Sequence, residues 1–195
     1  LANSTKLKDL RVYKNRNLTS GYAVLERFRD IEYLDLGNTG FSQSDMRYLT
    51  NLRYVKTLSV ASNGINDLGN LKNMSRLKTL NIRGNEITDL SPIPNLSNIN
   101  TFRGRNQSVT LDRAIENEWY PIKIETKSGR LNLTENGIGD VEYDSSKGLR
   151  WMNLIQFLEG DAEQDLTIEF EDPNNEFNGI ISQTVKPTHG PDPIA

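Results

Sequence analysis

The chain has 195 residues, of which 35% are apolar and 25% charged, a composition typical of one or two modest soluble domains. It contains no run of about 18 apolar residues, which a membrane-spanning helix needs, and its first residues do not resemble a signal peptide. The absence of cysteine excludes disulfides, thiol nucleophiles and thiolate metal sites, and the single histidine, His189, lies among prolines. Histidine-based catalysis and multi-histidine metal sites are therefore not expected.

The net charge of −3 is the remainder of two opposite charges along the chain. Up to residue 111, Lys and Arg number 16 against 9 Asp and Glu, and after it they number 7 against 17. The two parts carry +7 and −10, an asymmetry that indicates separate modules or functional faces.

An internal repeat organises the basic part of the chain. The pattern Val55-x-x-Leu58-x-Val60-x-x-Asn63-x-Ile65 recurs 22 residues later, beginning at Leu77, with Asn85 in the asparagine position. Related units begin at Leu7, Ile31 and Ile99, although Thr39 replaces the asparagine of one unit and Gly104 takes an apolar position of the last. The pattern matches the consensus of leucine-rich repeats.

Each such unit forms a short strand whose alternate residues point inward, and its asparagine can bond the backbone where the chain turns away. Because no unit can bury its apolar residues alone, we predict a stacked solenoid over residues 1–111, about four and a half repeats, with a parallel sheet on its concave side. Two prolines in residues 89–96 favour 3₁₀ or extended convex segments. The sequence opens in the convex half of a repeat without an amphipathic cap, so we expect a fragment or an unusually shielded start.

The 22-residue period stops after residue 111, and short segments with strand-like alternation follow. We predict strands over 122–126, 131–133, 165–171 and 180–185, with turn signals between them. These predict a small β-sandwich over residues 112–186, in which Trp151 is a core residue, and a linker or tail over 187–195.

Several of these motifs together resemble one bacterial family. The repeats with Asn-x-Ile-x-Asp-Leu at 63–68 and 85–90 resemble the internalin type of leucine-rich repeat. Residues 102–111 resemble the junction at which internalin repeats pass into an immunoglobulin-like domain, and residues 166–170 and 177–183 resemble closing strands of that domain.

The resemblance covers nearly the whole chain and implies both a fold and a setting. The implied fold is a leucine-rich-repeat solenoid followed by a small all-β immunoglobulin-like sandwich. Proteins similar to internalins are generally secreted or attached to the cell wall of Gram-positive bacteria, and several bind host receptors to promote adhesion or entry during virulence. The resemblance names no receptor.

The residues between the inward apolar positions of each repeat face outward, and we call them the concave face. The concave face comprises Lys8, Asp9, Arg11, Tyr13, Lys14, Glu32, Tyr33, Asp35, Gly37, Asn38, Lys56, Thr57, Ser59, Ala61, Ser62, Lys78, Thr79, Asn81, Arg83, Gly84, Asn100, Thr101, Arg103, Arg105 and Asn106. Eight of these residues are basic and three acidic. Our candidate ligand-binding residues are Arg11, Tyr13, Tyr33, Lys56, Lys78, Arg83, Arg103 and Arg105.

Arginines on neighbouring strands, about 4.8 Å apart, suit a bidentate grip on carboxylates or phosphates. The bland alternative for each basic residue is that it only solubilises an exposed sheet. For the cluster of Lys78, Arg83, Arg103 and Arg105 a binding role is as good an interpretation, since soluble surfaces normally intersperse both signs of charge.

Three classes of binding function compete. The first, which the resemblance favours, is a non-catalytic protein-binding module of a bacterial surface protein, whose basic concave face binds an acidic host protein. The second is binding of an anionic glycan or cell-wall polymer by the same face, on which only Tyr13 and Tyr33 are aromatic. Nucleic-acid binding is the third, but the overall acidity and the missing motifs argue against it.

An enzyme is the least supported class, and we expect no cofactor or metal. A serine triad would need His189, and no phosphate-binding glycine loop or dinucleotide fingerprint is present. Two-carboxylate glycosidase chemistry stays open, because any two acids can lie at its spacing. We interpret the acidic clusters at 159–165 and 169–172 as solvated surface; calcium capture within 161–165 is an alternative that lacks the EF-hand glycine and glutamate.

Overall fold

The computed structural model describes residues 6–18, 20–135, 139–154 and 163–188, and the strands in these ranges form two sheets. The larger sheet has the order β1-β2-β3-β4-β5-β11-β10-β7, and the smaller has the order β6-β9-β8. The repeats contribute β1 (Asp9–Arg11), β2 (Tyr33–Asp35), β3 (Thr57–Ser59), β4 (Thr79–Asn81) and the first residues of β5 (Thr101–Ile115). No helix within the described ranges is long and apolar enough to cross a membrane.

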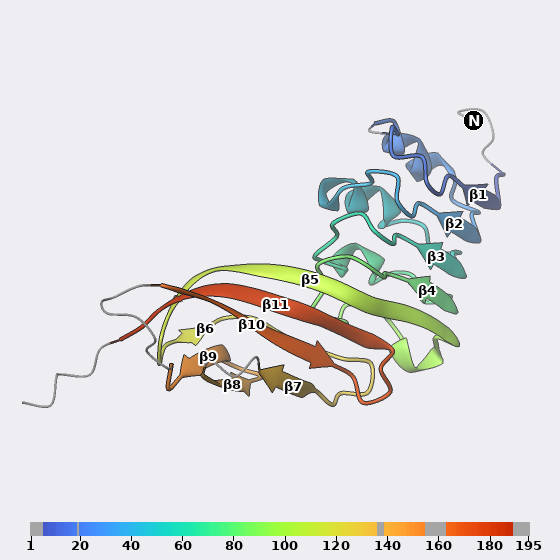
Figure 1. The fold of residues 1–195 in the computed structure, drawn as a ribbon. Helices are drawn as coiled ribbons and strands as arrows, with labels where there is room; N and C mark the ends of the chain where they lie inside the picture. Colours follow the sequence, from blue (N-terminus) through green and yellow to red (C-terminus); the bar gives the residue numbers. More distant parts are fainter. Residues whose placement is uncertain (1–5, 19, 136–138, 155–162, 189–195) are drawn as a thin grey trace, which may run out of the picture.

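The repeat strands stack in parallel and in register, as the period predicts (Figure 1). One apolar residue from each strand forms a continuous row across the sheet: Leu10, Leu34, Leu58, Leu80 and Phe102. The three central leucines of this row are completely buried. The leucine-rich-repeat part of the fold prediction is therefore confirmed.

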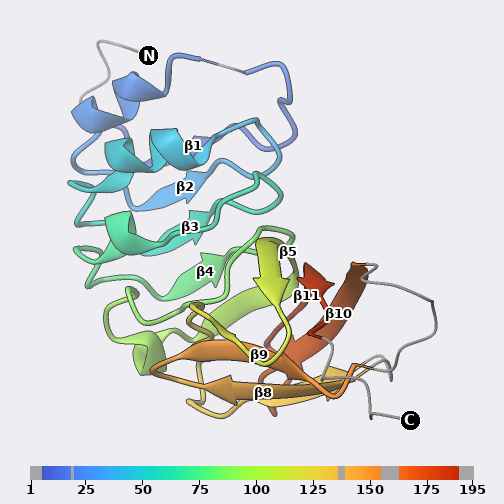
Figure 2. The ribbon, with the colours of Figure 1, turned by 90° about the vertical axis from the view of Figure 1, so that its left-hand side faces the viewer.

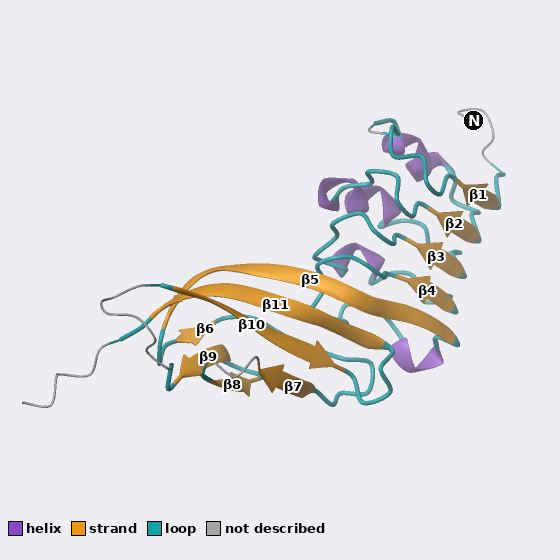
Figure 3. Cartoon of the chain, viewed as in Figure 1, coloured by secondary structure: helices purple, strands orange, loops and turns teal. Residues whose placement is uncertain are grey.

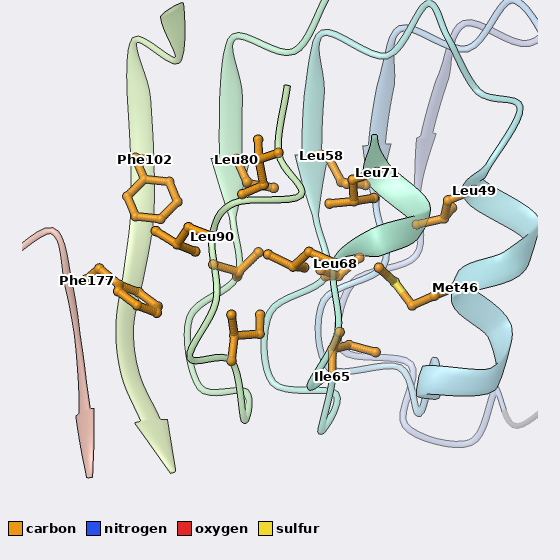
Figure 4. Packing of buried hydrophobic residues seen from close by; sticks show 14 of the residues in the cluster. Met46, Leu49, Leu58, Ile65, Leu68, Leu71, Leu80, Leu90, Phe102 and Phe177 are labelled. Atoms are coloured by element: carbon orange, nitrogen blue, oxygen red, sulfur yellow. The ribbon is translucent and has the colours of Figure 1, made fainter. Parts of the chain in front are cut away.

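Short 3₁₀ helices cover the other side of the repeats (Figure 3). They are η1 (Tyr22–Arg27), η2 (Gln43–Leu49), η3 (Gly69–Leu71) and η4 (Leu96–Asn98). The longest, η2, lies in a 24-residue repeat and begins with a capping box in which Ser42 and Asp45 satisfy each other's backbone groups. The core lies between these helices and the sheet, where Met46 and Leu49 pack toward Leu68 and Leu71 (Figure 4).

Buried amide side chains join each repeat to the one before it. Asn85 is 2% exposed, and its Nδ2 donates to the carbonyl oxygens of Ile82 at 2.8 Å and of Val60 at 3.1 Å. Its Oδ1 accepts from the backbone N–H groups of Asn63 at 3.0 Å and Ile65 at 3.1 Å. All the polar atoms of this side chain are therefore used where the chain leaves the sheet.

Two residues stand in place of the repeat asparagine, and both use their polar side chains to bond the backbone. Thr39 is fully buried and its hydroxyl donates to the carbonyl oxygen of Leu36 at 2.7 Å. Gln107 takes the asparagine position of the last repeat: its Nε2 donates to the carbonyl oxygen of Gly104 at 2.8 Å, and its Oε1 accepts from the N–H of Ile87 at 3.0 Å. Gln107 therefore continues the contacts between repeats, whereas the Thr39 hydroxyl bonds within its own repeat.

A single long strand, β5, joins the repeats to the rest of the chain. Residues 101–103 of β5 pair with β4, and from Gly104 onward β5 pairs in parallel with β11 (Phe177–Lys186). The open edge of the last repeat is therefore covered by a strand from the second module. The predicted boundary at residue 111 falls inside β5, and the division into two domains stays a prediction.

The second module places the smaller sheet against the end of the larger one (Figure 2). The larger sheet continues through β11, β10 (Gln164–Glu171) and β7 (Asn132–Glu135), and the smaller contains β6 (Trp119–Tyr120), β8 (Asp140–Asp144) and β9 (Gly148–Met152). Trp151 of β9 is 2% exposed and its Nε1 donates to Oε1 of Gln183 on β11 at 2.8 Å. The core role of Trp151 is confirmed, whereas the immunoglobulin-like sandwich stays a prediction.

The strand predictions for this module are only partly right. The expected strands at 131–133, 165–171 and 180–185 correspond to β7, β10 and β11. The expected strand at 122–126 is wrong, because the chain there runs along the repeats and forms only an isolated bridge between Glu125 and Asp89. Strands β6, β8 and β9 were missed, although Val141 and Tyr143 of β8 alternate with acidic residues.

We predict that Asn85→Ala destabilises the chain by about 1–3 kcal/mol, because it leaves buried N–H and carbonyl groups without partners. The matched control is Asn66→Ala, whose side chain is exposed, with an expected change within about 0.5 kcal/mol. Urea unfolding measures both. Equal losses in the two variants would contradict the role of the buried ladder.

Candidate binding face

The parallel register arranges the outward residues of the concave face in rows across the repeats. One row contains Arg11, Asp35, Ser59, Asn81 and Arg103. Backbone hydrogen bonds just beyond the strands align a second row, with Tyr13, Gly37, Ala61, Arg83 and Arg105. Arginines therefore occupy both ends of the first row, where the acidic Asp35 lies next to Arg11, and the last two positions of the second row. All eight predicted site residues are at least partly exposed.

Several charged residues of the first three repeats are paired within the protein. Glu32 accepts hydrogen bonds from Lys56 at 2.6 Å and from Lys8 at 3.1 Å, and these two ammonium groups hold the pKa of Glu32 below its ordinary value. Arg11 donates through Nε and an Nη group to both carboxylate oxygens of Asp9, which raises the pKa of Arg11. The predicted ligand residues Arg11 and Lys56 therefore already have acidic partners.

Aromatic rings on the concave face are likewise in contact with neighbours. The Arg11 guanidinium lies 4.1 Å from the centre of the Tyr33 ring. Tyr13 is 50% exposed and lies over Gly37, where a Cβ atom would come within 3.0 Å of its ring. The absence of a side chain at Gly37 thus lets the Tyr13 ring lie against the sheet.

The last two repeats are different, because their arginines line a cavity. Arg83, Arg103 and Arg105 surround a hollow of about 360 Å³ together with Asn175 and Glu176. Within the described ranges, the guanidinium groups of Arg83 and Arg103 make no ion pair or hydrogen bond. Lys78, the fourth member of the predicted cluster, lies outside the cavity, with its Nζ 3.5 Å from the carbonyl oxygen of Asn98.

The other wall of the cavity comes from the turn between β10 and β11, which sequence reasoning did not place there. Arg105 Nε donates to the carbonyl oxygen of Asn175 at 2.5 Å. The N–H of Gly104 donates to the carbonyl oxygen of Glu176 at 3.0 Å. The N–H of Asn106 donates to Oδ1 of Asn178 at 2.9 Å. The sequence predicted a turn at 172–175, but it did not predict the pairing of β11 with β5 that brings this turn to the repeats.

The packing at this junction explains why a glycine takes an apolar position of the last repeat. Gly104, which interrupts the apolar column, has no room for a side chain: a Cβ would lie 2.7 Å from the Phe102 ring and 2.9 Å from the Phe177 ring. Phe177 therefore fills the position that an apolar repeat residue would take. Lys127 pairs with Glu176 at 3.1 Å and lies 5.7 Å from the centre of the Phe102 ring.

Asp172 holds the β10–β11 turn in shape. Its side chain is completely buried and accepts hydrogen bonds from the N–H groups of Ser128 and Asn174, both at 2.9 Å. Burial by itself raises the pKa of Asp172, but these bonds stabilise the carboxylate more and hold its pKa below the ordinary value.

The described acidic residues of the second module have partners of other kinds. Within the described ranges, no group of three or more His, Asp or Glu residues could hold a metal ion. Glu163 pairs with Arg113, and Asp165 accepts from the hydroxyl of Thr184 at 2.6 Å. Asp161 of the calcium alternative and His189 lie outside the described residues.

Comparison with known proteins agrees with this geometry. The family Leucine Rich repeats (2 copies) matches residues 55–98. The functional domain of InlJ from Listeria monocytogenes superimposes with a TM-score of 0.58 over 94% of this chain, at 16% identity. InlP from Listeria monocytogenes gives a TM-score of 0.52 over 83% of the chain, at 15% identity. This chain has leucine-rich repeats and an internalin-like fold.

The likeness has clear bounds. This chain spans 44% of the InlJ chain and 48% of the InlP chain, less than half of either. The InlJ domain includes a cysteine ladder, which has no counterpart here because this chain has no cysteine. Comparison with curated protein sequences finds no match.

We predict that Asp172→Asn lowers the unfolding temperature at pH 7 and that the difference narrows in acid. Because the folded-state pKa of Asp172 is lowered, its carboxylate contributes stability above the ordinary Asp value of about 3.9, and this contribution is lost as the pH falls through the folded-state value. Thermal unfolding at pH 7 and at about pH 3 measures the gap. A gap that does not change with pH would show that the charge of Asp172 is unimportant.

Proposed function

We propose that this chain is a non-catalytic protein-binding module of a secreted or cell-wall-attached bacterial surface protein, and that its concave face binds an acidic protein ligand. The observation that carries the proposal is the cavity at the end of the repeats, where Arg83 and Arg103 have no acidic partner within the described ranges. Exposed arginines without partners are suited to bidentate bonds with carboxylates.

The size and rigidity of the face support a protein ligand. A standard protein interface uses about 20–30 residues on each side, and the concave face has 25 outward positions. The backbone ladder of parallel strands and the buried amide side chains fix these positions relative to one another. In this proposal the second module, in the role of the immunoglobulin-like domain, supports the end of the face.

An anionic glycan or cell-wall polymer is the alternative ligand for the same face. The half-exposed ring of Tyr13 over Gly37 favours this alternative, because sugar sites commonly include an aromatic platform. It lies at the other end of the repeats from the arginine cavity, in the same row as Arg83 and Arg105. An extended anionic polymer could contact both ends, whereas the protein-ligand proposal depends mainly on the arginines.

Reversal of the three cavity arginines tests the proposal. We expect the combined variant Arg83→Glu, Arg103→Glu and Arg105→Glu to abolish ligand binding, because it replaces three donors with three repelling carboxylates. The binding of wild type and variant is compared in a pull-down of host surface proteins and on a glycan array. The affinity of the identified ligand is then measured at about 50–500 mM salt.

The matched control makes the same charge change outside the concave face, in Arg29→Glu, Arg53→Glu and Lys72→Glu, which are exposed residues at or just after the 3₁₀ helices. This control should keep most of the binding. Equal losses in both triple variants, or an affinity independent of salt, would contradict a specific role of the cavity arginines. Capture on the glycan array alone would favour the polymer alternative.

A further inference from the structure

We propose that the β10–β11 turn forms one wall of the ligand site, and that the cavity between this turn and the arginines takes a carboxylate that has an ammonium donor beside it, such as an acidic residue next to a lysine on a protein surface. This inference rests on the proposed function and specifies the chemistry that the site recognises.

The change of partner along β5 places the turn at the arginines. Residues 101–103 of β5 pair with β4, and pairing with β11 begins at Gly104. The turn that precedes β11 therefore lies beside the outward residues of the last repeat (Figure 1). The bonds from Gly104 and Arg105 fix it there, so the cavity has a wall that belongs to the second module.

The arginines supply donors on one side of the cavity. Arg83 and Arg103 have their guanidinium groups unbonded within the described ranges. Arg105 uses its Nε to hold the carbonyl oxygen of Asn175, so it is fixed in position while it contributes charge to the cavity. A carboxylate is the anion that this set accommodates on a protein ligand.

Glu176 supplies an acceptor on the opposite side. Its Oε2 pairs with Lys127 at 3.1 Å, and the Lys127 side chain is only 19% exposed, so this pair is built into the wall. The Oε1 of Glu176 has no partner within the described ranges. Glu176 would repel a ligand that carried only carboxylates. A ligand with an ammonium donor next to the bound carboxylate would instead supply the hydrogen bond that Oε1 of Glu176 lacks.

The test uses two fluorescein-labelled peptides, hexaglutamate and a hexapeptide of alternating glutamate and lysine, with the full chain. Binding is measured by fluorescence anisotropy for wild type, Glu176→Gln and the control Glu169→Gln, which removes the same charge from an exposed position on β10 outside the arginine cavity. We expect Glu176→Gln to strengthen the binding of hexaglutamate and to weaken that of the alternating peptide, each on the order of 3- to 10-fold. Glu169→Gln should shift both affinities slightly and in the same direction.

Nuclear magnetic resonance of the wild-type chain gives a readout that does not depend on any variant. The alternating peptide should shift the Nε–H signals of Arg83 and Arg103 together with the backbone amides of Asn175 and Glu176. The inference is overturned if Glu176→Gln changes both affinities in the same direction, or if the turn amides do not shift.

Failure here and failure of the proposed function can be told apart. The triple arginine variant could lose protein-ligand binding while Glu176→Gln keeps the wild-type peptide preference. That result would contradict only the inference about the turn. Full binding in the triple arginine variant would instead remove the proposed function.

Discussion

The backbone hydrogen bonds on the two edges of β5 are the constraint on which the rest of the structure depends. On one edge, β5 completes the parallel sheet of the repeats, and on the other it pairs with β11. A repeat sheet that ended at β5 would leave its last row of N–H and C=O groups open. Because β11 satisfies them, the second module closes the solenoid and brings a distant turn to the arginines.

The two ends of the concave face differ because of where the acidic residues lie. Asp9 pairs with Arg11, and Glu32 pairs with both Lys8 and Lys56, so three of the basic residues in the first three repeats already have acidic partners. Near β5 the one acid in the arginine cavity is Glu176, which is itself paired with Lys127. In the folded chain, the excess of basic residues before residue 111 thus leaves a small basic site beside the junction between the repeats and the second module.

The sequence allowed the repeats to be predicted well and the junction poorly, for a physical reason. Leu34, Leu58 and Leu80 recur at a fixed period, and a local period determines which residues point inward. Gly104 looked like a defect because the ring that requires it, Phe177, comes from a strand 73 positions later in the chain. No local pattern states that β11 pairs with β5, so Glu176 could not be placed at the site.

Hydrogen exchange on Gly179→Ala tests most directly whether β5 joins the repeats and the second module into one cooperative unit. A Cβ at Gly179 would lie 2.5 Å from the carbonyl oxygen of Gln107, so the pairing of β11 with β5 must shift. Our account predicts faster exchange in β4 and β5 as well as in β11, with a single unfolding transition. In the control Gly69→Ala, the nearest neighbours of the new Cβ would be atoms of the Asp67 side chain, so β4 and β5 should stay protected. If β4 kept its protection in Gly179→Ala and the second module unfolded in a separate transition, the claim of one cooperative unit would be contradicted.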